Sequence, residues 1–172
     1  MAYLIFMLRH KWFVFLECLK LGVPIWRAII HDWDKIFAPH TFIAFKRRYD
    51  QGNDHYKMAN NSAYQMAYHL HCNRRHKHHW QWWISQLDEG KQRVLEMDDV
   101  SMREMLADWR GMGKTKHEPH TWIWYQWYRS QMTVHPQTLL WLDWQIAIEA
   151  ANYGGADEAA KFWDGIGKHE QA

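Results

Sequence analysis

The 172-residue sequence predicts an all-α fold with one main domain. Only nine glycines and four prolines interrupt the chain, and they stand where one helix would end or another would begin. Between these breaks the apolar residues do not show the regular alternation of a half-buried strand. Hydrophobic residues make up 48% of the chain and charged residues 23%, a globular composition in a chain long enough to bury a continuous core.

The first half of the chain predicts helices over residues 3–21, 24–31, 39–49, 55–75 and 78–87. Gly22 ends the first helix, and Pro24 and Pro39 each supply the first turn of a following one. Residues 50–53 form a loop. The first helix carries an apolar stripe that we expect to face the core, formed by Leu4, Leu8, Phe15 and Leu19.

The second half predicts helices over residues 102–110, 120–131 and 136–151, and a short helix over 156–164. Ser101-Met-Arg-Glu104 has the pattern of a capping box, so we expect a helix to begin at Met102 and to end at Gly111 or Gly113. Gly154 and Gly155 then break the chain. The sequence therefore predicts a helical metal-binding domain of residues 1–152 and a short C-terminal tail, residues 153–172, with freedom to move.

Charge and cysteine content limit the functional classes. The formal net charge is only +2, and the basic residues are scattered, which argues against nucleic acid as a partner. The apolar run over residues 1–8 is too short to span a bilayer and is followed at once by basic residues, so we expect no membrane association. Cys18 and Cys72 make no disulfide framework, which favours a reducing, cytoplasmic location.

Thirteen histidines in so short a chain require a chemical explanation. Divalent metals of the zinc, iron and manganese group bind imidazole and carboxylate ligands supplied by several helices. The candidate ligands fall in separate predicted helices or at their ends: His10, His31, Asp32, His69 or His71, His78, His79 and Asp108. A metal held there would lower the pKa of bound water to about 7. Lys35 stands one turn after Asp32 and could neutralise a phosphoryl oxygen.

The series His10, His31-Asp32-Trp-Asp-Lys35, His71, His78-His79 and Asp108 resembles the HD-domain phosphohydrolases. It is most similar to the subgroup with the signature His-Asp-x-Gly-Lys, although Asp34 stands where that signature has glycine. The resemblance implies a helical bundle of the HD-domain kind, divalent metals and hydrolysis of a phosphate ester or anhydride in a nucleotide. The motifs between residues 9 and 145, with His78-His79-Trp80 and Val134-His-Pro-Gln-Thr138 among them, also resemble an uncharacterised family of phages and bacteria.

Plainer interpretations exist for several of these residues. The histidines between 69 and 79 could form a solvated basic face, and Asp108 could be a surface residue of its helix. We interpret Glu104 as the capping-box residue rather than a ligand. Spacing alone does not decide between His69 and His71, although on a regular helix His71 and His78 would share a face. The aromatic run over residues 122–128 could stack nucleobases, but packing in a tryptophan-rich core explains it better.

The sequence thus predicts a cytoplasmic, metal-dependent phosphohydrolase that acts on a nucleotide or related small phosphate ester, in the host cytoplasm if a phage encodes it. His10, His31, Asp32 and Asp108 would hold the principal ion, and His71, His78 and His79 would hold a second. The ions would be Mn, Fe, Zn, Ni or Mg, and Asp32 and Lys35 would take part in catalysis. The alternative is a non-catalytic binding protein with a structural metal, and a homo-oligomer is compatible with either.

Overall fold

The computed structural model describes residues 1–52, 61–73 and 77–170, and within this part of the chain the fold is all-α, as predicted, with one short hairpin. The elements are α1 (Ala2–Lys20), α2 (Ile25–Ile30), α3 (Asp34–Phe37), α4 (Pro39–Asp50), α6 (Ser62–Cys72), the 3-10 helix η1 (Trp80–Trp83), β1 (Ile84–Gln86), β2 (Gln92–Val94), α7 (Asp99–Lys116), α8 (Thr121–Tyr128), the 3-10 helix η2 (Arg129–Gln131) and α9 (Pro136–Glu170). No helix in the described ranges is long and apolar enough to cross a membrane.

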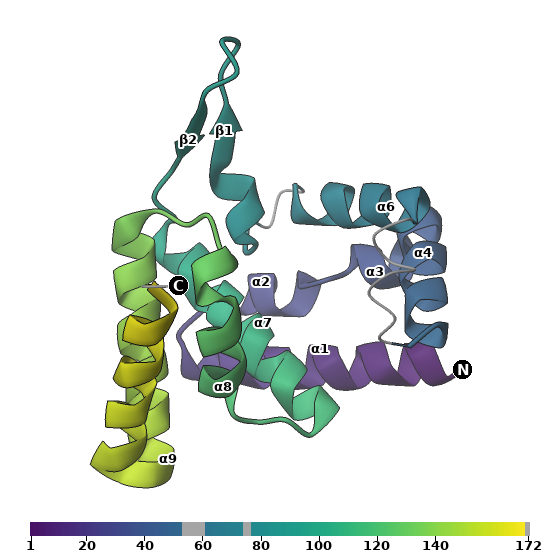
Figure 1. The fold of residues 1–172 in the computed structure, drawn as a ribbon. Coiled ribbons are helices and arrows are strands. Elements are labelled where there is room, and N and C mark those ends of the chain that lie inside the picture. Colours follow the sequence, from purple (N-terminus) through teal and green to yellow (C-terminus); the bar gives the residue numbers. More distant parts are fainter. Residues whose placement is uncertain (53–60, 74–76, 171–172) are drawn as a thin grey trace.

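Helix α1 runs across the molecule, and the other helices are arranged along it (Figure 1). The pair α4 and α6 lies near the N-terminal end of α1, whereas α8 and α9 lie at the opposite end. Helix α7 packs against α1, and the short helices α2 and α3 connect the two ends of the molecule. Segments from both halves of the chain therefore meet in the middle of the fold.

A glycine allows α1 and α7 to approach closely. A Cβ atom added at Gly111 of α7 would lie 2.5 Å from Val14 Cγ2 and 2.8 Å from the Val14 backbone nitrogen of α1. Separations this short are not tolerated between carbon atoms, so any larger residue would push the helices apart. Gly111 lies one turn after Asp108, and Val14 lies one turn after His10. The contact consequently sets the separation of two candidate ligands.

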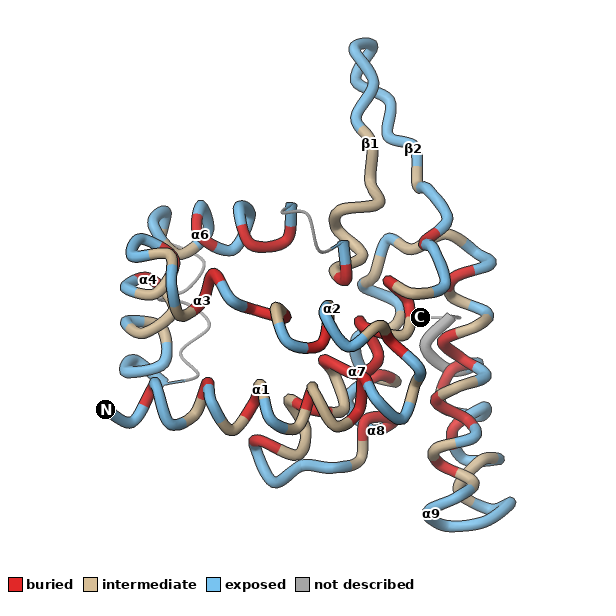
Figure 2. The backbone as a smooth tube through the Cα atoms, turned by 180° about the vertical axis from the view of Figure 1, so that it is seen from behind, coloured by how far each residue is buried: buried red, intermediate tan, exposed pale blue. Residues whose placement is uncertain are grey.

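The larger hydrophobic core lies between α7, α8 and α9, and a smaller one lies between α1, α2 and α7. In Figure 2 the buried residues follow α7 and one side of α9. The fully buried Tyr125, Leu142 and Phe162 belong to the larger core, whereas Val14, Cys18 and Ala107 belong to the smaller one. Since α7 contributes to both cores, it is the central helix of the fold.

The apolar stripe predicted for the first helix is wrong at three of its four residues, whereas the partly buried Phe15 packs against the smaller core. Leu4, Leu8 and Leu19 are 37%, 55% and 47% exposed. The buried residues of α1 are instead Tyr3, Met7, His10, Val14, Glu17 and Cys18. The buried face includes a histidine and a glutamate that find partners in the interior, and a pattern based on apolar residues alone places such side chains outside.

The helix predicted over residues 78–87 is also wrong. Residues 80–83 form the 3-10 helix, and β1 pairs with β2 in an antiparallel register that sets Ile84 opposite Val94. Gly90 has a φ of 76°, a left-handed conformation that glycine adopts without strain and that reverses the chain between the strands. Figure 1 shows that this hairpin projects from the helical body.

The long helix predicted over residues 55–75 lies partly outside the described residues, which omit 53–60 and 74–76. The described part, α6, begins at Ser62. Asn61 is its N-cap, and the Asn61 side chain accepts a hydrogen bond from the Tyr64 backbone N–H at 3.1 Å. Helix α6 ends at Cys72, so His71 lies on its last turn.

The capping box predicted at Ser101 is wrong. The N-cap of α7 is Asp98, whose side chain accepts a hydrogen bond from the Ser101 backbone N–H at 2.8 Å. The helix also continues through Gly111 and Gly113 to Lys116 and ends at His117 in the left-handed conformation. Glu104 is therefore well inside α7, and its side chain is free for another role.

The C-terminal half follows the prediction more closely. The helix predicted over 120–131 is present as α8 followed by the 3-10 helix η2, and α9 begins at Pro136 as expected. The break at Gly155 is a kink with a φ of 74° inside α9. Part of the predicted tail packs against the larger core, since Phe162 and Ile166 are buried there and Gln126 Nε2 donates to the Phe162 carbonyl at 3.1 Å.

Candidate metal centre

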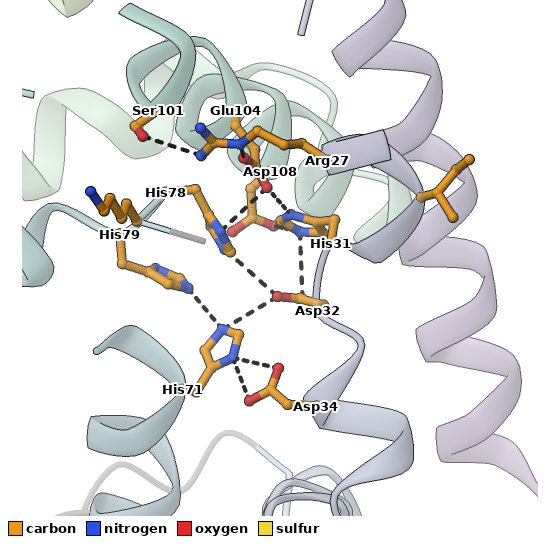
Figure 3. A network of polar contacts seen from close by, with 12 residues as sticks. Arg27, His31, Asp32, Asp34, His71, His78, His79, Ser101, Glu104 and Asp108 are labelled. Carbon is orange, nitrogen blue, oxygen red and sulfur yellow. Dashed lines mark hydrogen bonds and ion pairs between the residues drawn. The ribbon is translucent and has the colours of Figure 1, made fainter. Parts of the chain in front are cut away.

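The candidate ligands converge in the middle of the molecule, between α1, the segment from α2 to α3, α6, residues 78–79 and α7 (Figure 3). Among the described residues, three groups have ligand atoms that lie within 4.8 Å of one another and could hold a metal ion, and two of these groups contain the predicted ligands. The first group is His10, His31, Asp32 and Asp108, and the second is Asp32, His71, His78 and His79. The first group is the set that the sequence predicted for the principal ion. The second group contains the three histidines predicted for a second ion, and the structure adds Asp32, which is common to both groups.

Asp32 stands between the two groups and presents one carboxylate oxygen to each. Asp32 Oδ2 lies 3.2 Å from His10 Nε2 and 3.6 Å from His31 Nε2. Asp32 Oδ1 lies 3.3 Å from His71 Nε2 and 3.7 Å from His78 Nε2. Figure 3 shows the carboxylate between the rings of His31, His71 and His78. A carboxylate in this position could bridge two ions.

The backbone at Asp32 is in an unusual conformation. Its φ is 54°, in the left-handed region that aspartate tolerates better than most residues. The turn follows the end of α2, whose last carbonyls would otherwise lack partners. Lys11 of α1 donates from Nζ to the Ile29 carbonyl at 3.2 Å and also to the His31 carbonyl. The lysine thereby holds the turn that presents His31 and Asp32.

Asp108 completes the first group from α7. Its Oδ1 lies 3.1 Å from His10 Nε2 and 3.4 Å from His31 Nε2. His10 and His31 are fully buried, and Asp108 is nearly so. The expectation that Asp108 lies in the same group as His31 is confirmed, and its interpretation as a surface residue is wrong.

His71 is oriented by an aspartate that sequence reasoning did not select. His71 Nδ1 donates to Asp34, whose two carboxylate oxygens lie 3.0 Å and 3.1 Å away. Because a carboxylate only accepts, the His71 proton is on Nδ1 and Nε2 presents a lone pair. That Nε2 lies 2.8 Å from His79 Nε2 and faces Asp32. In metal sites, the ring nitrogen of a histidine that does not face the metal commonly donates its proton to a carboxylate, as His71 Nδ1 does here.

Glu104 orients His31 of the first group as Asp34 orients His71 of the second. His31 Nδ1 donates to Glu104 Oε1 at 3.2 Å, and His78 Nδ1 lies 3.4 Å from the same oxygen. Arg27 Nε donates to the other oxygen, Oε2, at 2.6 Å. The interpretation of Glu104 as a capping residue is therefore wrong. His31, His78 and Glu104 form a third group of clustered ligand atoms, but the arginine already neutralises that carboxylate.

Lys35 lies in the same interior. It is 8% exposed, and its Nζ donates to Asp32 Oδ2 at 2.7 Å. The ammonium also lies 5.3 Å from the centre of the Phe45 ring. A lysine one turn after Asp32 thus lies beside the clustered ligands, on the side that the spacing predicted.

The carboxylates make this interior strongly favourable for positive charge. Burial by itself lowers the pKa of His31, but Asp32, Asp108 and Glu104 together raise it to about 10. Burial likewise lowers the pKa of Lys35, yet Asp32 and Asp108 raise it overall. Conversely, His31 and Lys35 hold the pKa of Asp32 well below its ordinary value despite burial. The field that holds a proton on His31 would also favour a metal cation.

Several buried polar atoms at the site lack a hydrogen-bond partner among the described residues. They are His10 Nδ1, His31 Nε2, Asp32 Oδ1, and both ring nitrogens of His78. Unpaired buried polar atoms are uncommon and costly, at about 1–3 kcal/mol each. Most of these atoms face the clustered carboxylates and imidazoles (Figure 3). Coordination of cations would satisfy them, so the residues fit a metal site.

The structure decides between the two histidines of α6. His69 is exposed, and Asn73 Nδ2 donates to its carbonyl at 2.9 Å, whereas His71 is buried among the ligands. The reason given from the sequence was wrong, because His78 lies beyond the end of α6 rather than two turns along it. The shared face results from the tertiary fold.

Asp34, Glu104 and Arg27 are the residues that sequence reasoning missed. Glu104 carried a usable signal, because it lies four residues before Asp108 and hence on the same face of the helix. Asp34 was noticed only as a departure from the His-Asp-x-Gly-Lys signature. Arg27 carried no signal in the sequence, since its role depends on how α2 packs against α7.

Comparisons with curated proteins and with solved structures give no significant match. Residues 2–148 match the model of a family of unknown function, DUF5662, and this stretch contains every ligand candidate named above. The chain therefore belongs to the DUF5662 family.

Proposed function

We propose that this protein is a metal-dependent phosphohydrolase that acts on a nucleotide or a related small phosphate ester. The observation that supports it most is the buried Lys35 ammonium, 2.7 Å from the aspartate shared by both ligand groups. A lysine cannot coordinate a cation while it is protonated, so a metal site does not need one as a ligand. A substrate that carries negative charge would account for its presence.

The charges at the site support an anionic substrate. The described carboxylates are Asp32, Asp34, Glu104 and Asp108, and the basic side chains are Lys11, Arg27 and Lys35. With neutral imidazoles, four negative and three positive charges leave a formal charge of −1. One divalent ion changes this to +1, and two change it to +3. A positively charged interior favours a phosphate group and stabilises negative charge that develops on it.

The residues have distinct roles in this proposal. His10, His31, Asp32 and Asp108 would hold one ion, and His71, His78 and His79 would hold a second together with Asp32. A bound divalent metal lowers the pKa of water and so supplies a nucleophile at neutral pH. Lys35 would contact a phosphoryl oxygen and offset its charge. The resemblance of the His-Asp motif to HD-domain phosphohydrolases also supports this proposal.

A second candidate is a non-catalytic protein in which the metal only stabilises the fold. The burial of the site favours it, since His10, His31, Asp32 and His78 are at most 2% exposed. Two cavities, of about 490 Å³ and 850 Å³, lie elsewhere and are lined by residues of the α7–α8 region and α9 rather than by the ligands. A structural metal needs a closed shell without an open coordination position.

The experiment that tests the proposal combines metal analysis with an assay of phosphate or nucleoside release from a panel of nucleotides. We expect bound divalent metal and hydrolysis of at least one substrate. His31→Ala should lose both the metal and turnover. Lys35→Ala should retain the metal and lose turnover by about a hundredfold or more. Lys161→Ala is the matched control, because Lys161 is an exposed lysine of α9 whose ammonium pairs only with Glu158 among the described residues.

Two outcomes would contradict the proposal. Bound metal without hydrolysis of any nucleotide in the panel would favour the structural-metal candidate. Loss of metal from Lys35→Ala as complete as that from His31→Ala would show that Lys35 maintains the turn rather than contacting substrate.

A further inference from the structure

Glu104 contacts both ligand groups through one oxygen atom. Its Oε1 accepts from His31 Nδ1, which belongs to the first group, and lies 3.4 Å from His78 Nδ1, which belongs to the second. Figure 3 shows both rings turned toward this carboxylate on α7. Asp34, by contrast, accepts hydrogen bonds from His71, a member of the second group. Glu104 therefore lies beside a ligand of each group, whereas Asp34 accepts from a ligand of the second group.

The position of Glu104 is itself fixed from the side away from the ligands. Arg27 Nε donates to Glu104 Oε2 at 2.6 Å, and Arg27 Nη2 donates to Ser101 Oγ at 3.1 Å. The Glu104 side chain is fully buried, so water does not compete for these contacts. Oε2 of Glu104 thus accepts a hydrogen bond from Arg27, and Oε1 lies within 3.4 Å of an Nδ1 atom of both His31 and His78.

From these contacts we infer that Glu104 is a positioning residue that couples the two ion sites. His31 donates from Nδ1 to Oε1, and His78 Nδ1, which makes no hydrogen bond to a described residue, lies 3.4 Å from the same oxygen. A proton held on each Nδ1 by this carboxylate would leave both Nε2 atoms with lone pairs for the ions, one at each site. Loss of this carboxylate would disorder one ligand at each site simultaneously. The inference rests on the metal binding of the proposed function, but not on hydrolysis.

A glutamine at this position cannot replace the carboxylate. Its amide has a single acceptor oxygen, whereas Glu104 faces Arg27 on one side and two imidazole nitrogens on the other. If the amide oxygen faces Arg27, the NH2 group faces the two Nδ1 atoms. An NH2 group only donates, so it cannot accept the proton that each Nδ1 must carry to leave Nε2 free for the metal. If it faces the imidazoles, the NH2 group opposes the arginine. Either arrangement weakens the orientation of His31 and His78.

The experiment is a calorimetric titration of Zn²⁺ into metal-free protein, with Glu104→Gln compared to Asp34→Asn. We expect the wild-type protein to bind two equivalents. Glu104→Gln should weaken the binding of both by about 10–100-fold, the usual effect of losing an outer-shell partner. Asp34→Asn removes the carboxylate that accepts from His71, a ligand of the second group, and should weaken only one equivalent. Melting curves of the metal-free variants show whether each is folded.

Arg27→Gln provides a second test if Glu104→Gln does not fold. It keeps the carboxylate but removes its anchor, and it should weaken both equivalents by a smaller factor. Loss at a single equivalent in Glu104→Gln or Arg27→Gln, or unchanged affinity, would overturn the coupling. A wild-type protein that binds no Zn²⁺ would overturn both the inference and the proposed function. Two bound equivalents without nucleotide hydrolysis would overturn only the latter.

Discussion

Substitution of Gly111 by alanine tests whether the contact between α1 and α7 sets the geometry of the candidate site. The added Cβ would lie 2.5 Å from Val14 Cγ2 and 2.8 Å from the Val14 backbone nitrogen. Ordinary carbon contacts are about 3.5–4.0 Å long. Because a backbone atom is involved, rotation of one side chain does not relieve the overlap. We therefore expect the two helices to separate by about 1 Å.

The size of the effect follows from two opposing contributions. Overpacking of a core costs about 1–3 kcal/mol. Replacing glycine by alanine within a helix contributes about 0.8–1.0 kcal/mol of stability in the opposite direction. The net loss should be up to about 2 kcal/mol, which lowers the melting temperature of a chain this size by up to about 8 °C.

The same displacement should weaken metal binding. His10 Nε2 and Asp108 Oδ1 lie 3.1 Å apart, each one turn from the contact between Val14 and Gly111. Metal–ligand distances tolerate a change of only about 0.2 Å. A shift of α1 by about 1 Å should consequently reduce affinity at the first group by about tenfold or more.

Thermal unfolding of metal-free protein and Zn²⁺ titration measure the two effects. Gly167→Ala is the control, because a Cβ added at this helical glycine meets nothing within 4 Å. It should leave metal affinity unchanged and raise stability slightly. If Gly111→Ala melted at or above the wild-type temperature and bound Zn²⁺ as tightly, the close contact between the helices would not control the site.

Three further predictions concern stability. Chelation should lower the melting temperature of the wild-type protein, because a metal present at about 100 times its Kd adds about 2.7 kcal/mol to the free energy of unfolding. Asp32→Asn removes the carboxylate shared by both groups, so the melting temperature of this variant should not respond to chelator. Burial raises the pKa of Glu17, but hydrogen bonds from Lys114 and Lys20 lower it overall below 4.5. This depressed pKa stabilises the fold above about pH 4.5 and loses that effect as the pH falls through the folded pKa. Glu17→Gln should hence be less stable than wild type in urea unfolding at neutral pH, and the difference should shrink as the pH falls below about 4.5; a difference independent of pH would contradict the assignment. Asp98→Ala should lose about 1 kcal/mol with the N-cap of α7, whereas Asp99→Ala, which removes an exposed carboxylate without a capping role, should lose less.

Much of the fold class and the candidate site could be predicted from residue type and order. Sparse glycine and proline, together with the absence of strand alternation, indicated helices, and α1, α2, α4 and α9 begin within a residue or two of the predicted positions. The residues that converge at the site were also selected from the sequence. Imidazoles and carboxylates have a chemistry that does not depend on the fold, so their clustering in successive predicted helices was informative before any contact was known.

Other features were settled only by tertiary structure. The buried face of α1 includes His10 and Glu17 because carboxylates and lysines from other elements meet them in the interior. The segment after His79 forms a hairpin rather than a helix because Gly90 reverses the chain and the two strands pair. Local propensity is weaker than such pairing, and it contains no information about which partner a segment meets.

The same distinction applies to the site. Ligand identity follows from the side chains themselves, and the sequence was sufficient to propose it. The choice of His71 over His69 depends on contacts that only the folded chain makes. The same is true of the orienting roles of Asp34 and Glu104, because Asp34 and His71 are 37 positions apart in the sequence, and His31 and Glu104 are 73 apart. Hydrogen bonds act over about 3 Å. The carboxylate that orients each imidazole is therefore known only after α2, α6 and α7 have packed, because their packing decides which ring nitrogen faces a carboxylate.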